Sequence, residues 1–234
     1  MHIRIMARMA LLVFAALFAS LAQADRPPSV YLDGKTETGV VLLHGHGGTA
    51  DGNVVGPLMR MFNTEFGYHT LSLDLPQVME KVARPQLAAA YAPRYPEVEK
   101  RIEQGIDFLV RQKNVKAVYL VGFSAGARMM TAYLAKHPGQ AFAGYVSVST
   151  SCGGPAPMDS NDNLTRVMVP VLDIYGSGSP TDLSCAAGRK DLAEMVEHYK
   201  VVQVAGAQHN FRGDEAQLSA FVADWVRGLS GTAK

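Results

Sequence analysis

Ser124 stands at the centre of the stretch GFSAG (122–126), and the segments on either side indicate why a serine is placed there. Residues 115–123 form an apolar, β-branched run typical of a buried strand, and residues 125–138 have the pattern of a helix. In a tight strand-to-helix turn the central residue adopts a strained backbone, and the residues two positions away must be small. The serine hydroxyl then lies at a helix N-terminus, where the helix dipole favours developing negative charge. The pattern predicts a nucleophile, and the alternative is an ordinary turn.

A serine hydroxyl is a weak nucleophile and needs a base, for which the chain offers seven histidines. Six of them lie in the N-terminal segment, in a glycine-rich loop, at the start of a strand or near the ends of predicted helices. His209, in the stretch AGAQHNF (205–211), follows the last predicted strand, at the carboxyl edge of the sheet. It alone has the chain order and the position that a base for Ser124 requires. We predict His209 as general base and acid; the alternative is a loop histidine without a catalytic part.

Two aspartates compete for the role of the carboxylate that orients His209. Asp182 lies in the stretch GSGSPTD (176–182), in the loop beyond the predicted strand 169–176. Asp173 lies inside that strand, which is expected to be covered on both faces, so its carboxylate needs a buried partner. Asp182 is on the same side of the sheet as the serine and the histidine and is the favoured acid, while Asp173 is retained as the alternative.

The stretch LLHGHGG (42–48) supplies candidates for an oxyanion hole, the donors that stabilise the negative charge of a tetrahedral intermediate. It follows an early predicted strand and precedes a helix, and its glycines allow backbone N–H groups to approach a ligand closely. The N–H groups of His46 and Ala125 form the natural pair. The alternatives are a glycine-rich turn and a phosphate-binding loop, but a phosphate loop requires G-K-[ST], which does not follow.

Strand-like and helix-like segments alternate along the body of the chain. The predicted strands are 39–45, 68–76, 115–123, 142–150, 169–176 and 200–206, and the predicted helices are 54–66, 95–113, 125–138, 184–198 and 214–229. This alternation predicts an α/β protein with a mostly parallel sheet and helices on both faces. Function in such sheets lies at the carboxyl ends of the strands. The stretch 77–94 interrupts the alternation and is expected either to shape a substrate cleft or to form a surface connection.

Cys152 and Cys185 are the two cysteines of the chain. Each follows a predicted strand, and the two strands are consecutive in the predicted sheet, so the loops at their carboxyl ends should be neighbours. We predict a disulfide between them, and the alternative is two buried free thiols. Neither a CxxC pair nor a zinc-ligand spacing occurs, and a serine mechanism needs no metal or organic cofactor.

Residues 1–24 have the features of a signal peptide: the basic residues Arg4 and Arg8, a short apolar run, and small residues before a cut that we place after Ala24. The alternative is a retained membrane anchor, for which the apolar run is short. We therefore expect an exported protein, periplasmic or secreted, in which residues 25–234 form one domain.

The composition, with 48% hydrophobic and 18% charged residues, is that of an ordinary globular domain. Removing the signal segment changes the formal net charge from +1 to −1, because two basic residues and no acidic residue are lost. Nothing in this balance favours a nucleic-acid partner or an anionic membrane surface.

Taken in chain order, the stretches LLHGHGG, GFSAG, PVLDIYG and AGAQHNF resemble those of the α/β-hydrolase superfamily, whose catalytic residues come in the order Ser, Asp, His. The resemblance covers about residues 30–229. The stretch PVLDIYG with the late HNF is similar to that of exported bacterial α/β-hydrolase-like proteins of unassigned function. LLHGHGG is similar to the oxyanion segment of small carboxylesterases and dienelactone hydrolases. The chain departs from the superfamily in one respect, because Ser179 stands where the acid usually follows the strand.

This resemblance implies an α/β-hydrolase fold with little or no cap and hydrolysis through an acyl-serine intermediate. Ser124, His209 and Asp182 would form the triad, and the substrate would be a small-molecule ester or other acyl compound. The alternatives are an amide or peptide hydrolase of the same fold and a non-catalytic envelope protein on a hydrolase scaffold. No cofactor, no nucleic-acid partner and no stable membrane insertion after signal removal are expected.

Overall fold

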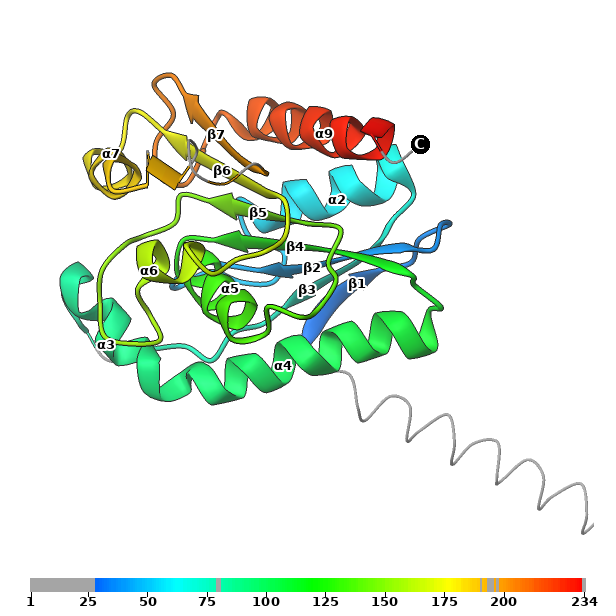
Figure 1. Cartoon of the computed structure of the whole chain (residues 1–234), viewed down its shortest axis with the longest axis horizontal. Helices are drawn as coiled ribbons and strands as arrows, with labels where there is room; N and C mark the ends of the chain where they lie inside the picture. Colours follow the sequence, from blue (N-terminus) through cyan, green and yellow to red (C-terminus); the bar gives the residue numbers. More distant parts are fainter. Residues whose placement is uncertain (1–27, 79–80, 190, 193–195, 197, 233–234) are drawn as a thin grey trace, which may run out of the picture.

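A seven-stranded sheet forms the centre of the molecule (Figure 1). The structure is a computed structural model that describes residues 28–78, 81–189, 191–192, 196 and 198–232, so the predicted signal peptide, 1–24, lies outside the described residues. The strands are β1 (Ser29–Leu32), β2 (Thr38–Leu43), β3 (His69–Leu73), β4 (Ala117–Phe123), β5 (Gly144–Val148), β6 (Val171–Gly176) and β7 (Tyr199–Val204). Their order across the sheet is β1-β3-β2-β4-β5-β6-β7, and all neighbours pair in parallel except β1, which is antiparallel to β3.

The inner strands are buried on both faces. Every residue of β3, β5 and β6 is buried, as expected for parallel strands that read as near-continuous apolar runs. The predicted α/β class with a mostly parallel sheet is therefore confirmed. The short edge strand β1 is not among the predicted strands; its residues are only half-buried and carry a weaker pattern.

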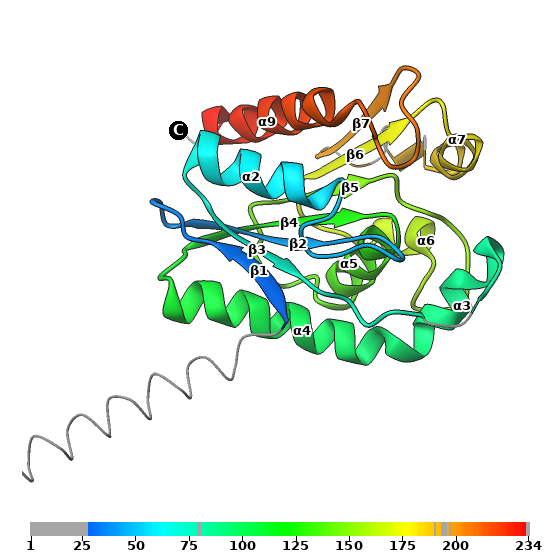
Figure 2. The same cartoon turned by 180° about the vertical axis from the view of Figure 1, so that it is seen from behind.

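Helices cover both faces of the sheet (Figures 1 and 2). They are α2 (Val55–Phe66), α3 (Leu87–Tyr91), α4 (Tyr95–Asp107), α5 (Ala125–Lys136), α6 (Ser160–Leu164), α7 (Pro180–Ala187) and α9 (Glu215–Thr232), with short 3-10 turns at Arg84–Gln86 and Ala92–Arg94 and a π-helical turn at Phe108–Gln112. α2 and α9 pack together against one face, while α4 and α5 pack against the other. Each face thus has its own apolar core.

The amphipathic pattern of α4 illustrates how the sequence places these helices. Val98 and Ile102 are one turn apart and fully buried, in the same core as Leu71 and Leu73 of β3. The opposite face of the helix carries charged side chains, among them Glu97. Burying an aliphatic side chain stabilises the fold by about 1.5–3 kcal/mol, so this stripe fixes the helix against the sheet.

The helix after β6 begins earlier than predicted. α7 starts at Pro180, because the Ser179 side chain caps it by accepting the N–H of Asp182 at 3.3 Å and proline suits the first helical position. The helix ends at Ala187, so the predicted start of a helix at residue 184 is wrong. The later part of the predicted range, up to residue 198, includes residues outside the described ones. This shift places Asp182 in the first turn of a helix and not in a loop.

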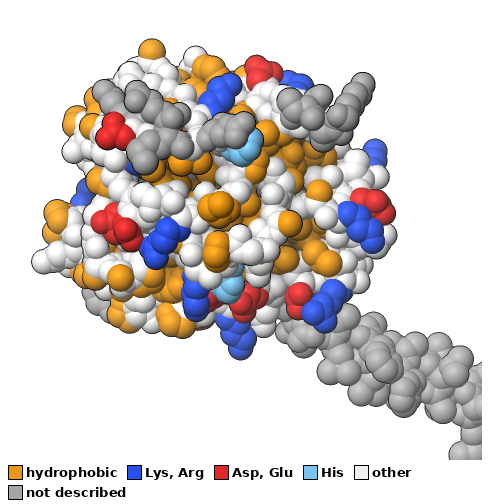
Figure 3. Space-filling model, viewed as in Figure 1, with side chains coloured by type: hydrophobic (Ala, Val, Ile, Leu, Met, Phe, Trp, Pro, Cys, Tyr) orange, Lys and Arg blue, Asp and Glu red, His pale blue; other side chains and the backbone are white. Residues whose placement is uncertain are grey.

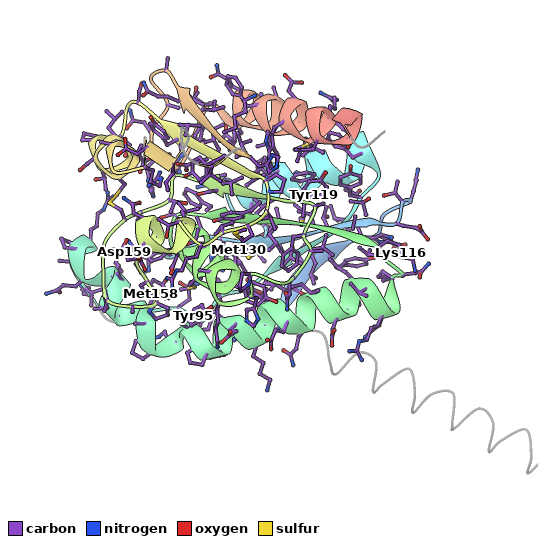
Figure 4. The ribbon with its side chains drawn as sticks, in the orientation of Figure 1. Tyr95, Lys116, Tyr119, Met130, Met158 and Asp159 are labelled. Atoms are coloured by element: carbon purple, nitrogen blue, oxygen red, sulfur yellow. A yellow bond between two sulfur atoms is a disulfide. The ribbon has the colours of Figure 1, made fainter. Side chains whose placement is uncertain are left out.

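The carboxyl ends of the parallel strands gather on one side of the molecule. Lys116, which directly precedes β4, lies on the far side from Met158 and Asp159, which belong to the loop after β5 (Figure 4). Side chains that follow the strands therefore meet at a single edge of the sheet, where the topology of open α/β sheets places a binding site.

The surface carries charges of both signs. On the face shown in Figure 3, basic and acidic side chains are interspersed and form no extended area of one sign. Among the described residues, each helix is too short or too polar to traverse a bilayer.

Candidate active site

A sharp turn between β4 and α5 carries Ser124. Its φ of 52° lies in the left-handed region, which is strained for a residue with a side chain. Gly122 and Gly126 make the turn sterically possible, because a Cβ at either position would lie 2.4 Å from a backbone atom, of Ala127 and of Leu43 respectively. The two glycines of the GFSAG stretch are therefore required by the close approach of the backbone around the serine.

A continuous chain of hydrogen bonds joins Ser124, His209 and Asp182. Ser124 Oγ lies 2.9 Å from His209 Nε2, and His209 Nδ1 lies 2.7 Å from Asp182 Oδ1. Because an ionised carboxylate only accepts, His209 Nδ1–H donates to Asp182, and Nε2 is left to accept the hydrogen of the serine hydroxyl. The Asp182 side chain is 1% exposed and that of His209 is 32% exposed. The arrangement can take a proton from the serine and stabilise the imidazolium that results.

The loop that leads into α7, the helix of Asp182, is held against the loop that carries His209. Gly178, just before α7, donates its N–H to the carbonyl of Ala207 at 2.9 Å. On the other side of His209, Phe211 is fully buried in the core beneath α2 and α9 and has a φ of 50°. The histidine is thus fixed on both sides by contacts that leave its ring at the surface of the sheet edge.

Asp173, the alternative acid, has a different set of partners. Its carboxylate forms an ion pair with Arg189 at 2.7 Å and accepts a hydrogen bond from the hydroxyl of Tyr199 at 3.0 Å. Burial, together with Asp173, raises the pKa of Tyr199 above its usual value, so the hydroxyl stays protonated and donates. The structure brings Asp182 and not Asp173 to His209.

The two residues expected to supply the oxyanion hole, His46 and Ala125, line the same cavity as Ser124. The loop that carries His46 packs tightly on the serine turn, since a Cβ at Gly45 would lie 3.2 Å from the Cβ of Ser124. Ala125 is the first residue of α5, where a helix leaves its N–H groups without intrahelical acceptors. Among the described residues, the N–H of His46 has no acceptor either.

Two histidine side chains of this loop have structural partners. His44 is buried; its Nδ1 lies 2.7 Å from the carbonyl of Gly45, and its Nε2 accepts the N–H of Leu75 at 3.0 Å. Burial lowers the pKa of His44, so its ring stays neutral and keeps both hydrogen bonds. His46 is exposed, and its Nδ1 lies 2.8 Å from the hydroxyl of Tyr91 on α3. These contacts hold the loop in place from two sides.

Cys152 and Cys185 form the predicted disulfide, with their Cα atoms 5.2 Å apart. The bond joins the loop after β5 to α7, one turn beyond Asp182. In the chain-entropy treatment a bridge across 33 residues stabilises the folded state by about 3–4 kcal/mol. It therefore helps to fix α7, the helix that carries Asp182.

A cavity of about 650 Å³ opens over Ser124 and His209. Its walls include residues 44–49, residues 151–154 and several side chains of the stretch 77–94, among them Leu87 and Tyr91. Of the two interpretations of that stretch, the structure supports the one in which it shapes a cleft. The lining combines apolar side chains such as Leu87 and Phe123 with polar ones such as Ser124 and His209, a mixture that suits a small-molecule ligand.

Arg84 and Tyr91, both in the stretch 77–94, line the cavity together with Arg128 of α5, and none of these three side chains was predicted individually from the sequence. Arg128 could have been recognised from the sequence, because it is a charged residue in the mostly apolar stretch that follows Ser124. No local pattern in the sequence indicated Tyr91, because its contact with His46 joins residues 45 positions apart.

A group that could hold a metal lies elsewhere. Within the described part of the chain, Glu99, Glu103 and His137 are the one set with suitable ligand atoms close together. Glu99 already pairs with Lys136 at 2.8 Å and with His137 at 2.9 Å. The set lies on α4 and at the end of α5, away from Ser124, and has no part in the hydrogen-bond chain.

Comparisons with known proteins identify the fold. A family model described as "Protein of unknown function (DUF3530)" matches residues 89–228. The comparison with curated proteins gives no match. Est1E from Butyrivibrio proteoclasticus with ferulic acid bound has a TM-score of 0.68 at 12% identity, over 87% of this chain and 95% of that chain. A dienelactone hydrolase from Anabaena variabilis has a TM-score of 0.64 at 21% identity, and the match covers 85% of this chain and 89% of that chain. A serine hydrolase without lid from Xanthomonas campestris has a TM-score of 0.62 at 17% identity, and the match covers 86% of this chain and 93% of that chain.

These likenesses show that the chain has the α/β-hydrolase fold, as the resemblance in the sequence predicts. Among the described residues, no cap domain is evident over the cavity. At these identities the likeness concerns the fold alone, so any activity depends on what this chain's own residues can do.

Proposed function

Because the chain belongs to the DUF3530 family, whose description assigns no activity, we propose a function from its own site: a serine hydrolase that cleaves small carboxylic esters through an acyl-serine intermediate. The observation that carries this proposal is the hydrogen-bond chain from Asp182 through His209 to Ser124, which ends in an open cavity. The solved Est1E with bound ferulic acid supports a small molecule as the substrate.

The first half of the reaction forms the acyl-enzyme. Ser124 Oγ attacks the ester carbonyl carbon while its proton moves to His209 Nε2, and Asp182 stabilises the imidazolium and keeps its ring orientation. The carbonyl oxygen becomes an oxyanion that accepts hydrogen bonds from the N–H groups of His46 and Ala125. When the tetrahedral intermediate collapses, His209 gives its proton to the departing alkoxide, and the alcohol leaves.

The second half releases the acid. A water molecule loses a proton to His209 Nε2 and attacks the acyl carbon, and the same two N–H groups stabilise the second oxyanion. The bond to Ser124 Oγ then breaks, and His209 returns the proton to the serine. Open access to the cavity suits this step, because water must reach the acyl-enzyme.

Labelling by a fluorophosphonate probe tests this function. We expect rapid covalent labelling of the mature protein at Ser124, because only a serine activated by a base reacts quickly with such probes. Peptide mass spectrometry locates the label, and Ser124→Ala protein is the negative control. If the wild-type protein stays unlabelled and cleaves no p-nitrophenyl ester above the buffer rate, the chain is a non-catalytic protein on a hydrolase scaffold.

We further propose that residues 1–24 are removed on export and that residues 25–234 act as one domain in the periplasm or outside the cell. The predicted signal features and the disulfide Cys152–Cys185 support an oxidising compartment. Intact-mass spectrometry of the exported, unreduced and alkylated protein is expected to show a chain that begins at Asp25 with neither cysteine alkylated. Retention of the first 24 residues would contradict the cleavage, and two alkylated cysteines would contradict the disulfide.

A further inference from the structure

Arg128 lies one turn beyond Ser124 on α5, and its side chain reaches the wall of the cavity although the residue is only 6% exposed. The guanidinium donates to three backbone carbonyl groups of the loop after β5. Nη2 donates to Cys152 O at 3.0 Å, and Nη1 donates to Gly153 O and Met158 O. Figure 4 shows Met158 close to α6 at this end of the molecule. These bonds hold the guanidinium in a fixed position.

Two of the five N–H donors of this guanidinium have no acceptor among the described residues. They belong to Nε and Nη2. Nε is not among the fully buried polar atoms that lack a partner, and Arg128 is one of the residues that line the cavity. A fixed guanidinium with unused donors binds carboxylate well, because charge-assisted hydrogen bonds are about twice as strong as neutral ones.

The positive charge of Arg128 has no contacting counter-ion in the described part of the chain. Its three acceptors are neutral carbonyl groups, and none of the ion pairs in that part includes it. Burial lowers the pKa of Arg128, and Asp159 offsets part of this effect through space, but a guanidinium remains charged at neutral pH. A buried charge without a contacting counter-ion is costly even when neutral groups accept its hydrogen bonds, so an anion in the cavity would stabilise it.

The rest of the cavity suits the same ligand. Of the described residues that line it, none is an aspartate or a glutamate, and the exposed Arg84 adds a second cation. Leu87 and Ala88 add apolar surface to the lining. The lining therefore fits a short apolar chain that ends in an anionic group.

We propose that Arg128 binds a free carboxylate of the substrate, so that the preferred substrates are small esters that carry a second carboxylate, such as monoesters of dicarboxylic acids. This inference rests on the function proposed above and adds the substrate class to it. The carboxylate accepts hydrogen bonds from Nε and Nη2 while the ester carbonyl lies at Ser124. No bond to Arg128 forms or breaks, so Arg128 is a binding residue and the chemistry stays with Ser124 and His209.

A pair of substrates that differ by one charge tests the inference. The ratio of kcat/KM for monomethyl adipate to kcat/KM for dimethyl adipate is measured in the wild-type protein and in variants, so that the intrinsic reactivity of each ester cancels. Monomethyl succinate and monomethyl suberate extend the series, because the span between Ser124 and Arg128 sets the best chain length. We expect Arg128→Met to lower the best ratio roughly 10- to 100-fold, as the loss of charge-assisted hydrogen bonds predicts.

The matched control is Arg111→Met, which removes the same charge from an exposed side chain outside the cavity. Its ratio is expected to equal that of the wild type. If Arg128 only fastens the loop after β5, Arg128→Met lowers the melting temperature but leaves the ratio unchanged, and the inference is wrong.

A binding measurement keeps Arg128 intact, because Arg128→Met leaves three carbonyl groups without their donor and can fail to fold. In Ser124→Ala protein, adipate is expected to raise the melting temperature, whereas adipamide, its neutral counterpart, is not. Equal effects of adipate and adipamide, or none, would overturn the inference, and a larger effect of inorganic phosphate would assign the site to phosphate esters instead.

The outcomes separate this inference from the proposed function. Efficient hydrolysis of dimethyl adipate without preference for any monomethyl ester removes only the carboxylate site. Absence of labelling and of hydrolysis removes the proposed function, while the binding of adipate to Ser124→Ala protein still reports on Arg128.

Discussion

Ser124→Ala is expected to lower kcat/KM for p-nitrophenyl acetate by roughly 10⁶-fold, the size of loss that follows removal of a triad serine. The nucleophile and the hydrogen bond to His209 Nε2 both disappear, while the cavity and the backbone donors remain. The side chain is only half-buried and lies in no packed core, so the free energy of unfolding should change by less than about 1 kcal/mol. Steady-state kinetics above the buffer rate and calorimetric melting measure the two effects.

His209→Ala should cause a loss of similar size, because triad residues act as a unit. The double variant of Ser124 and His209 is therefore expected to be little slower than either single variant. Ser184→Ala, at an exposed position on α7, is the matched control and should keep the wild-type rate. Near-normal turnover in Ser124→Ala protein would show that this serine is not the nucleophile.

Substitution of the two aspartates should give opposite results. Asp182→Asn is expected to lower kcat by up to ~10⁴-fold, because an amide no longer fixes the tautomer in which His209 Nδ1 carries the hydrogen. The N-cap of α7 uses the backbone N–H of this residue and the Ser179 side chain, and neither is altered. The melting temperature should therefore stay close to that of the wild type.

Asp173→Asn should instead destabilise the protein, because it leaves the buried charge of Arg189 without its partner. Breaking a buried pair in this way costs about 3–5 kcal/mol, which corresponds to a drop of roughly 10 °C in melting temperature for a chain of this size. Turnover of the folded fraction, measured well below the transition, should be near normal. The reverse pattern in the two variants would make Asp173 the acid, and two active, stable variants would mean that something else orients His209.

Local sequence patterns predicted the parts of the site that local sterics determine. The GFSAG turn could be predicted because two glycines that flank a serine, between a strand and a helix, favour a tight and strained turn over any regular element. His209 and Asp182 could be placed because parallel strands bring their carboxyl ends to one edge. The position of Asp182 on a helix was also encoded in Ser179 and Pro180, a capping signal that the loop interpretation overlooked.

Contacts between distant segments were not predictable in the same way. Asp173 could be judged hard to bury, but nothing in the sequence named Arg189 and Tyr199 as its partners. The three carbonyl acceptors of Arg128 lie in an irregular loop 24 to 30 residues away. Such pairings arise when tertiary packing brings loops together, and they carry no periodic signal.

The disulfide between Cys152 and Cys185 has a consequence for the order in which the molecule matures. Arg128 donates to Cys152 O on one side of the bridge, and Asp182 lies one turn before Cys185 on the other. The bridge therefore links the helix that follows Ser124 to the helix that carries Asp182. A newly made chain in a reducing compartment lacks this link, and the helix that carries Asp182 is held less firmly. If the protein is an exported hydrolase, as proposed, oxidation after export is the step that completes its site, and the producing cell carries the protein in a latent form until it has crossed the membrane.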